Sequence, residues 1–581
     1  MLALACLVQA WMVVRAIVPA QDSIRYLTVA QAMARDGWLT AVRAQPEQPL
    51  FPSLVCLTHS VLSHTLGASS RHWVLSLQLV AAAAMVVCTV PVYFLFDRLH
   101  GRRAALLATL LFSVLGGVAR LGADGLSDST HLLFFCIALW TAAEYFTRFG
   151  RRPAAAWLFA CGLSTGLALL ARAEAVVLPL ALWAALAASP FTRRCRQSWS
   201  MALSGAGALL LGLLPPLAIY LAACPGNHVD LAARLLGRGG AIESLPLNEL
   251  SPSHAAADAE AKWNLPGVGR LVFGKKDFSA SSRFRGGLPA AAKLVEELAQ
   301  TLHYGLGALA LAGLWFSRRR LNAPLDRFMQ ILCGALLLAA LYVAADGGYL
   351  STRHLLLLVV LALGWAAVGA LTIGDWLVER VSRRPLMRFD VQDRKGLSRQ
   401  RPPWRSAEGE SALICSSRNT TEGVPYRRRW RVFPISNNKT RAVAWSVAAL
   451  AMANCAGDLL RPLHASRAPH RQAAEWLQAH AAAGDAVLDS RGWTALYTGC
   501  KTYRYEAAQA AFCDRNLAYV VVEQAELESP SRRGETLRAL VTEAGEPAVQ
   551  FSSAQAAKHG VTIWRWHPER FAQLGVVSDA R

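Results

Sequence analysis

The sequence contains about eleven apolar runs that are long enough, or nearly long enough, to cross a membrane as helices. A hydrocarbon core of about 30 Å requires roughly 20 apolar residues in a helix. The 581 residues are 54% hydrophobic and only 17% charged, which argues against a disordered chain and against an ordinary soluble enzyme. The sequence therefore predicts an all-α polytopic membrane protein. The predicted spans are 2–18, 74–96, 104–119, 132–146, 154–171, 175–188, 201–223, 304–316, 328–345, 355–371 and 442–456.

Positive charge marks the loops that we expect on the cytoplasmic side. With the N-terminus inside, every arginine cluster between spans falls on an inner loop, as the positive-inside rule requires. The stretch 380–441 holds 16 Lys and Arg against 5 Asp and Glu, so it carries about half of the net charge of +21. The loop 224–300 and the tail from 459 onward are almost balanced in charge, and we assign both to the outside.

The tail reads as a small α/β domain. An amphipathic helix is expected over 473–480, and strand-like runs occupy 485–489, 518–523 and 561–566. The sequence thus predicts four parts. They are a transmembrane body over 1–375 with an outer loop over 224–300, a basic cytoplasmic linker over 376–441, a last transmembrane helix over 442–458 and an extracytoplasmic α/β domain over 459–581.

Two features of these parts have more than one interpretation. The basic linker carries aromatic residues among its cations, which is also typical of nucleic-acid binders. We interpret it as a poorly ordered segment that contacts anionic lipid headgroups, and we expect no nucleic-acid partner. Cys500 and Cys513 lie in the outer tail, where either a disulfide or two free thiols fit the expected compartment.

Acidic residues follow the first predicted span and precede the fourth. Asp22 begins a segment in which Ile24, Leu27 and Ala30 recur at helical spacing, so we expect an interfacial helix on the outer surface. At this place Asp22 is either the cap of that helix or a catalytic carboxylate. Asp124 lies a turn before the residues that would cap the next helix, so capping does not explain its presence.

Arginines stand at the same predicted boundary. Arg172 and Glu174 occupy a tight outer turn between spans five and six, and Arg353 and His354 precede span ten. Guanidinium groups suit phosphate because they present several N–H donors in one plane. If the topology holds, these side chains meet the acidic residues at one outer rim. Such a cluster suits a lipid-borne phosphate leaving group, with a carboxylate that takes the proton of an incoming hydroxyl.

Five short motifs, in this order along the chain, resemble the membrane glycosyltransferases of the C-type fold. They are Asp22-x-x-Arg-Tyr-Leu, Glu47-Gln-Pro-Leu-Phe-Pro, Ala123-Asp-Gly-Leu-Ser-Asp-Ser, Arg172-Ala-Glu and Tyr349-Leu-Ser-Thr-Arg-His. Over about residues 1–375 the chain is similar to the protein O-mannosyltransferase and lipid A aminoarabinose transferase group. The resemblance implies a polyprenyl-phosphate sugar donor, a protein or lipid acceptor outside the cytoplasm, and inversion at the anomeric carbon.

The resemblance also assigns roles by position. Asp22 matches the acidic residue of the first outer loop, the implied general base, and Arg353 is the candidate for the donor phosphate. Ser23 and Gln48 stand where the group often has a second acid and a histidine, so the acceptor and a divalent cation stay open. No metal ligand is assigned. The candidate catalytic residues are Asp22, Asp124 and Asp128, and the candidate substrate-binding residues are Arg25, Tyr26, Arg172, Glu174, Tyr349, Arg353 and His354.

Two other functional classes remain. A transporter or lipid flippase would also be polytopic and positive-inside, but such proteins usually show internal repeats and helices interrupted in mid-bilayer. The two halves of this chain show no convincing repeat. A receptor or scaffold is supported only by the tail domain. Release of free lipid phosphate from a polyprenyl-phosphate sugar is expected only from an enzyme.

Overall fold

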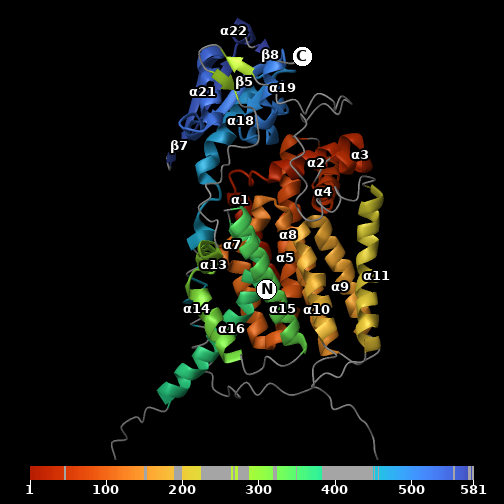
Figure 1. The fold of residues 1–581 in the computed structure, drawn as a ribbon. Helices are drawn as coiled ribbons and strands as arrows, with labels where there is room; N and C mark the ends of the chain where they lie inside the picture. The colour runs from red at the N-terminus through yellow and green to blue at the C-terminus, as the bar shows by residue number, and fades with distance from the viewer. Residues whose placement is uncertain are drawn as a thin grey trace, which may run out of the picture.

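The computed structural model of the chain has two parts, a helical body and a smaller domain of helices and strands that is stacked on one end of it (Figure 1). The described residues are 1–44, 47–67, 69–148, 154–188, 199–223, 263–265, 269–271, 287–317, 324–347, 350–382, 446, 449–450, 452–453, 455, 457–553, 556–573 and 577–578. The predicted outer loop and last transmembrane helix are therefore described only in part. The basic linker from 383 to 441 lies outside the described residues.

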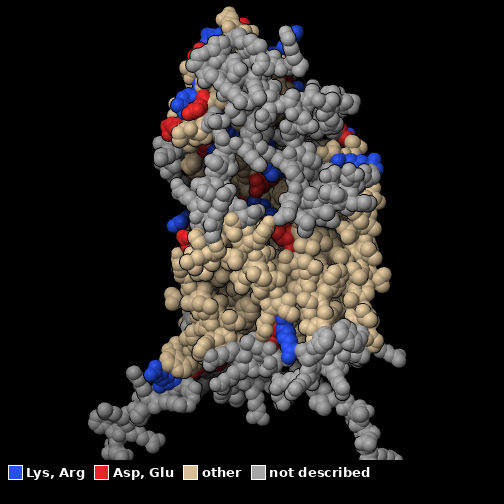
Figure 2. Space-filling model, viewed as in Figure 1, with Lys and Arg blue, Asp and Glu red and all other residues tan. Residues whose placement is uncertain are grey.

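The body is built from apolar helices. Five described helices are long and apolar enough to cross a membrane, and α6 with α7, bent by 53° at Leu115, make a sixth if the pair is one span. Figure 2 shows the middle of the body as a broad surface almost free of charged side chains. These features confirm the helical membrane fold, whereas the number of eleven spans stays a prediction. The helices are α1 (Leu2–Arg15), α2 (Ser23–Asp36), α3 (Trp38–Ala44), α4 (Leu50–Leu66), α5 (Ser70–His100), α6 (Arg102–Val114), α7 (Gly116–Asp124), α8 (Ser127–Thr147), α9 (Ala154–Ala171), η1 (Ala173–Val176), α10 (Val177–Ala188), α11 (Trp199–Ala223), α13 (Gly287–Thr301), α14 (Gly305–Ser317), α15 (Pro324–Gly347) and α16 (Thr352–Ser382).

A sharp turn separates α7 from α8. α7 ends at Asp124 because Gly125 adopts φ +64°, a left-handed conformation that a glycine takes without strain. A Cβ at this position would lie 1.6 Å from Cδ2 of Leu77 on α5, so any larger residue would also force this side chain to move. α8 then begins at Ser127. The turn brings the first residues of α8 to the end of the body that faces the C-terminal domain.

The C-terminal domain contains a five-stranded sheet in the order β4-β3-β5-β7-β6. β3 (Ala486–Asp489) is parallel to β4 (Lys501–Tyr503) and to β5 (Leu517–Glu523), whereas β7 (Ala556–Trp566) is antiparallel to β5 and to β6 (Gly545–Ser553). The domain is thus α/β, as expected. β3 and β5 match the predicted strands to within one residue, β7 begins five residues before the predicted strand 561–566, and β4 and β6 were not predicted. The helices of the domain are η5 (Ala465–Arg467), α18 (Ala468–His480), η6 (Trp493–Leu496), η7 (Tyr505–Ala507), α19 (Ala508–Cys513), α20 (Gln524–Leu527), α21 (Arg532–Ala544) and α22 (Pro568–Gln573).

The outer loop and the C-terminal domain share a small sheet, and the two cysteines of the domain are not bonded to each other. β1 (Trp263–Leu265) of the outer loop is antiparallel to β2 (Gly269–Leu271) and to β8 (Val577–Ser578), so the loop pairs with the end of the C-terminal domain. Cys500 and Cys513 are both free thiols.

The C-terminal domain is packed against the start of α2. Trp493 and Leu496 of η6 share one apolar core with Ile24 on α2 and Phe51 on α4. The indole Nε1 of Trp493 also donates a hydrogen bond of 3.3 Å to the carbonyl of Pro19. The domain therefore holds the segment that leads into α2, and with it the position of residue 22.

Candidate active site

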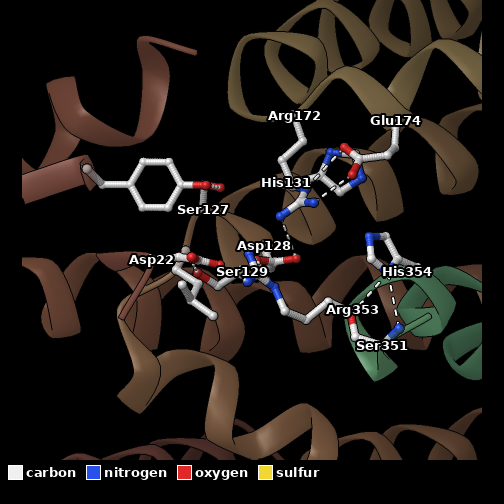
Figure 3. Close-up of polar contacts among 12 residues, drawn as sticks. Asp22, Ser127, Asp128, Ser129, His131, Arg172, Glu174, Ser351, Arg353 and His354 are labelled. Atoms are coloured by element: carbon white, nitrogen blue, oxygen red, sulfur yellow. Dashed lines mark hydrogen bonds and ion pairs between the residues drawn. The ribbon is translucent and has the colours of Figure 1, made fainter. Parts of the chain in front are cut away.

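Arg353, in the first turn of α16, joins two carboxylates from distant parts of the chain (Figure 3). Its Nη1 lies 2.5 Å from Oδ2 of Asp22, which immediately precedes α2. Its Nη2 and Nε lie 2.7 and 3.1 Å from Oδ2 of Asp128, in the first turn of α8. The structure thus brings three of the predicted site residues into direct contact.

A second arginine extends the cluster. Nη1 of Arg172 donates to Oδ1 of Asp128 at 2.9 Å, and its Nη2 and Nε form a two-pronged pair with Glu174 at 2.6 and 3.1 Å. Asp128 therefore binds one guanidinium through each of its oxygens. With Asp22 included, three carboxylates face two guanidinium groups, so the cluster has a formal net charge of −1.

The two aspartates that bind Arg353 differ in burial. The side chain of Asp128 is 3% exposed, whereas that of Asp22 is 51% exposed. Asp128, which is almost fully buried and has both oxygens in ion pairs, is fixed in place and hardly accessible to solvent. Asp22 is therefore the accessible one of these two aspartates. Glu174 is 47% exposed, but both of its oxygens accept hydrogen bonds from Arg172.

Asp22 occupies the N-cap position of α2 but does not cap the helix. Its side chain accepts no hydrogen bond from the first turn, and its backbone is helical instead of extended. Capping therefore does not explain this carboxylate. Tyr26, one turn along α2, has a hydroxyl that accepts a hydrogen bond of 2.8 Å from Ser127, and burial raises its pKa. Tyr26 thus stays uncharged and connects α2 to α8.

Two histidines flank the arginines. Nδ1 of His354 accepts a hydrogen bond of 3.2 Å from the main-chain N–H of Ser351, which assigns the proton of a neutral ring to Nε2. His131 is buried on α8, with Nδ1 3.3 Å from the carbonyl of Ala168, and lies beside Glu174 in Figure 3. The sequence analysis missed His131. Its position three residues after the acidic residue 128 on a helix would have placed both on one face.

The remaining predicted residues lie outside this cluster. Oδ1 of Asp124 is 2.8 Å from Nε2 of His464, and its main-chain carbonyl accepts a hydrogen bond of 2.5 Å from the Ser23 hydroxyl. Asp124 thus connects the body to the segment that enters the C-terminal domain. Arg25 is exposed on α2 and forms no ion pair with any described residue. Tyr349 lies outside the described residues.

A metal centre is not formed by the described part of the chain, where no group of three or more His, Cys, Asp and Glu side chains is arranged to hold an ion. The cation that joins Asp22 to Asp128 is the guanidinium group of Arg353. The arrangement can hold an anionic group at the two arginines and accept a proton at Asp22.

One part of the chain matches a known protein family. Residues 49–219 match the family model of the dolichyl-phosphate-mannose-protein mannosyltransferases. This segment contains Asp128, Arg172 and Glu174 but neither Asp22 nor Arg353. No curated protein matches the sequence.

Solved structures resemble the chain over nearly its whole length. ArnT from Cupriavidus metallidurans bound to undecaprenyl phosphate is 13% identical, with a TM-score of 0.52 over 97% of this chain and 96% of that one. The Archaeoglobus fulgidus oligosaccharyltransferase tethered with an acceptor peptide is 12% identical, with a TM-score of 0.50 over 96% of this chain and 72% of that one. The chain has the C-type membrane glycosyltransferase fold. The fold expected from the motifs is thus confirmed. The matched family and both neighbours are glycosyltransferases.

Proposed function

We propose that this C-type protein is an integral membrane glycosyltransferase that moves a sugar from a polyprenyl-phosphate donor to a hydroxyl of a protein or lipid acceptor. Transfer takes place at the extracytoplasmic end of the bundle, with inversion at the anomeric carbon. The observation that carries the proposal is the cluster in which Arg353 joins Asp22 to Asp128 at the edge of the apolar body. The matched family and the neighbour bound to undecaprenyl phosphate support it.

Asp22 acts as the general base. Its half-exposed carboxylate takes the proton of the acceptor hydroxyl, and the hydroxyl oxygen attacks the anomeric carbon from the side opposite the phosphate. The bond between the anomeric carbon and the phosphate oxygen breaks, and the polyprenyl phosphate leaves with the bonding electron pair. A positioned base typically contributes about 10²–10⁴-fold to the rate.

Arg353 and Arg172 bind the phosphate and stabilise the charge that develops on it as it leaves. Because Nη1 of Arg353 is already paired with Asp22, the phosphate competes with this carboxylate for the same donor. That exchange releases the Asp22 carboxylate when the donor is bound. Asp128 and Glu174 hold the two guanidinium groups in orientation throughout, and the imidazole of His354 adds a donor at the same rim.

Substitution at Asp22 tests the proposal. Purified protein in nanodiscs is incubated with a panel of polyprenyl-phosphate sugars and with a membrane extract from cells that lack the protein, which supplies the acceptor. Free polyprenyl phosphate is then measured by mass spectrometry. We expect release by the wild type and its near-complete loss in Asp22→Asn. Asp36→Asn is the matched control, since Asp36 lies at the end of the same helix and, among the described residues, pairs only with its exposed neighbour Arg35 at 2.9 Å. Absence of release by the wild type with every donor would refute the proposal.

A transporter or flippase is not favoured, because the buried carboxylates of α8, Asp128 and Glu144, lie near the two ends of this helix instead of at its middle. The acceptor is identified by mass spectrometry of extracellular glycoproteins and glycolipids from cells with and without the protein. Sugar on a protein defines one acceptor class, and sugar on a lipid defines the other.

A further inference from the structure

Three arginines gather at one edge of the sheet in the C-terminal domain, away from the cluster around Arg353. Arg491 is the second residue after β3, Arg467 precedes α18, and Arg533 lies in the first turn of α21. The edge is formed by the carboxyl ends of β3 and β5. Since the chain continues from β3 to β4 on one side and returns to β5 on the other, the strand order changes direction between β3 and β5. Open α/β sheets bind ligands at such a switch point.

Two buried glutamates hold the arginines together. Glu523, 1% exposed at the end of β5, pairs with Arg467, with Nε of Arg491 at 3.0 Å and with Nδ1 of His559 at 2.7 Å. Glu526, 8% exposed on α20, pairs with Nε of Arg491 at 3.3 Å and with Nη2 of Arg533 at 2.7 Å. The three guanidinium groups thus form one continuous network.

Most of the donors in this network are unused. A guanidinium group carries five N–H bonds. Arg467 donates to its glutamate only through Nη1, Arg491 only through Nε, and Arg533 only through Nη2. Nε of Arg533 is buried and has no hydrogen-bond partner. The three side chains are 25 to 31% exposed, and the guanidinium groups of Arg467 and Arg533 lie over the rings of Trp493 and Tyr505.

Other buried polar atoms beside the network also lack partners. The Ser490 hydroxyl is buried without a hydrogen bond, although the carbonyl of the same residue accepts one of 2.8 Å from Arg533. Both ring nitrogens of His470 are buried and unpaired, with the ring 4.5 Å from that of Trp493, over which the Arg467 guanidinium lies. Buried polar atoms without partners are uncommon and costly. A bound polar group would satisfy them.

The unused N–H donors of the three arginines favour an anionic ligand. Asp489 also lies at this edge, but its carboxylate is already satisfied by the main-chain N–H groups of Arg491 and Thr494 and by the Thr494 hydroxyl. The unpaired N–H donors at this edge are those of the three arginines, and of the carboxylates only Glu526 keeps a buried oxygen, Oε2, without a hydrogen-bond partner among the described residues. Planar guanidinium groups bind the oxygens of a tetrahedral phosphate in pairs. We propose that this edge, formed by Arg467, Arg491 and Arg533 with Ser490, is a phosphate-binding site.

The location of the site suggests which substrate carries the phosphate that it binds. The carbonyl of Arg491 accepts a hydrogen bond of 3.3 Å from Nε2 of Gln21, the residue before Asp22. The side of the domain that carries the arginines is thus attached to the segment that carries the base. Figure 2 shows a recess with charged atoms between the domain and the apolar body. The assignment to the acceptor rests on the proposed function: the acceptor carries a phosphate, bound here, and presents its hydroxyl to Asp22.

Binding of inorganic pyrophosphate tests the site independently of sugar transfer. Full-length protein in phosphatidylcholine nanodiscs is titrated by calorimetry. We expect Arg533→Gln and Arg467→Gln each to weaken binding by about tenfold, because each removes a charge-assisted contact. Each variant leaves both glutamates with another partner, Arg491. Arg538→Gln is the matched control, since Arg538 lies on the same helix α21 but donates only to the carbonyls of Leu527 and Ser529.

Two results would overturn the site: no binding of pyrophosphate by the wild type, or equal affinity in the wild type and both variants. A second set of nanodiscs, containing phosphatidic acid, identifies the source of the phosphate. Competition by this lipid with pyrophosphate assigns the site to a lipid-borne phosphate, and unchanged binding assigns it to a soluble one; either result supports the site. Binding without any sugar transfer would refute the proposed function and leave the site intact.

Discussion

Replacing Asp22 and Asp128 by asparagine, one at a time, should give different results although both carboxylates bind the same guanidinium group. Asp22→Asn should leave stability nearly unchanged, because the side chain is 51% exposed and an exposed ion pair contributes only about 0–1 kcal/mol. Transfer should nevertheless fall by about 10²–10⁴-fold, because the general base is lost.

Asp128→Asn should destabilise the fold. The Asp128 side chain is 3% exposed and accepts hydrogen bonds from Arg172 and Arg353, which are themselves 17% and 24% exposed. Removing one partner of a buried ion pair costs about 3–5 kcal/mol. We expect the lower end of that range, since Arg172 keeps Glu174 and Arg353 keeps Asp22. Activity should fall together with the folded fraction.

The assay compares both variants with wild type and with Asp36→Asn in nanodiscs. Thermal unfolding gives the midpoint, and mass spectrometry gives the release of polyprenyl phosphate at a temperature where all variants are folded. Near wild-type turnover by Asp22→Asn would remove this residue from the role of base. Equal midpoints for Asp22→Asn and Asp128→Asn would show that the difference in burial does not determine stability.

Three further substitutions test other parts of the structure. Arg353→Lys keeps the charge but cannot contact both aspartates, so the KM for the donor should rise about tenfold while the unfolding midpoint changes little; an unchanged KM would argue against phosphate binding at this residue. Gly125→Ala places a side chain at φ +64° against Leu77 and should cost about 1–3 kcal/mol, measured as a lower midpoint, whereas an unchanged midpoint would contradict the steric argument. Burial lowers the pKa of His470 to about 4 from its ordinary 6.5. Between about pH 6.5 and pH 4, this histidine is therefore protonated in the unfolded chain but neutral in the folded domain. Stability should therefore drop by about 3 kcal/mol across this window, and His470→Leu should flatten the drop in midpoints recorded from pH 7 to 4; an equally steep profile would exclude His470 as its cause.

Much of the fold could be predicted because apolar length and periodicity are local properties of a sequence. α9 begins and ends at the predicted residues, and β5 follows a run rich in valine that the pattern identified as a strand. β4 has only three residues, and β6 contains Pro547 and few apolar residues, so neither shows a clear strand pattern. The break between α6 and α7 occurs within one apolar run, which hydropathy reads as continuous.

The candidate site could be predicted in outline but not in detail. Topology alone brings residues 22, 128, 172 and 353 to one end of the bundle, and the structure shows that these four are in contact. The pairing of Asp124 with His464 depends on how the C-terminal segment packs against the body, and no local pattern encodes that contact. The different exposure of the two aspartates around Arg353 likewise arises from tertiary packing.

The segment that leads into α2 has consequences for how the protein matures. Ile17 pairs with Leu463 through the main chain, Trp493 holds Pro19, and Gln21 reaches Arg491. During synthesis the base emerges early, but these partners emerge more than 440 residues later. A nascent chain that has inserted its first helices lacks the contacts that fix this carboxylate. Under the proposed function, transfer therefore begins only after the distal domain has folded against this segment.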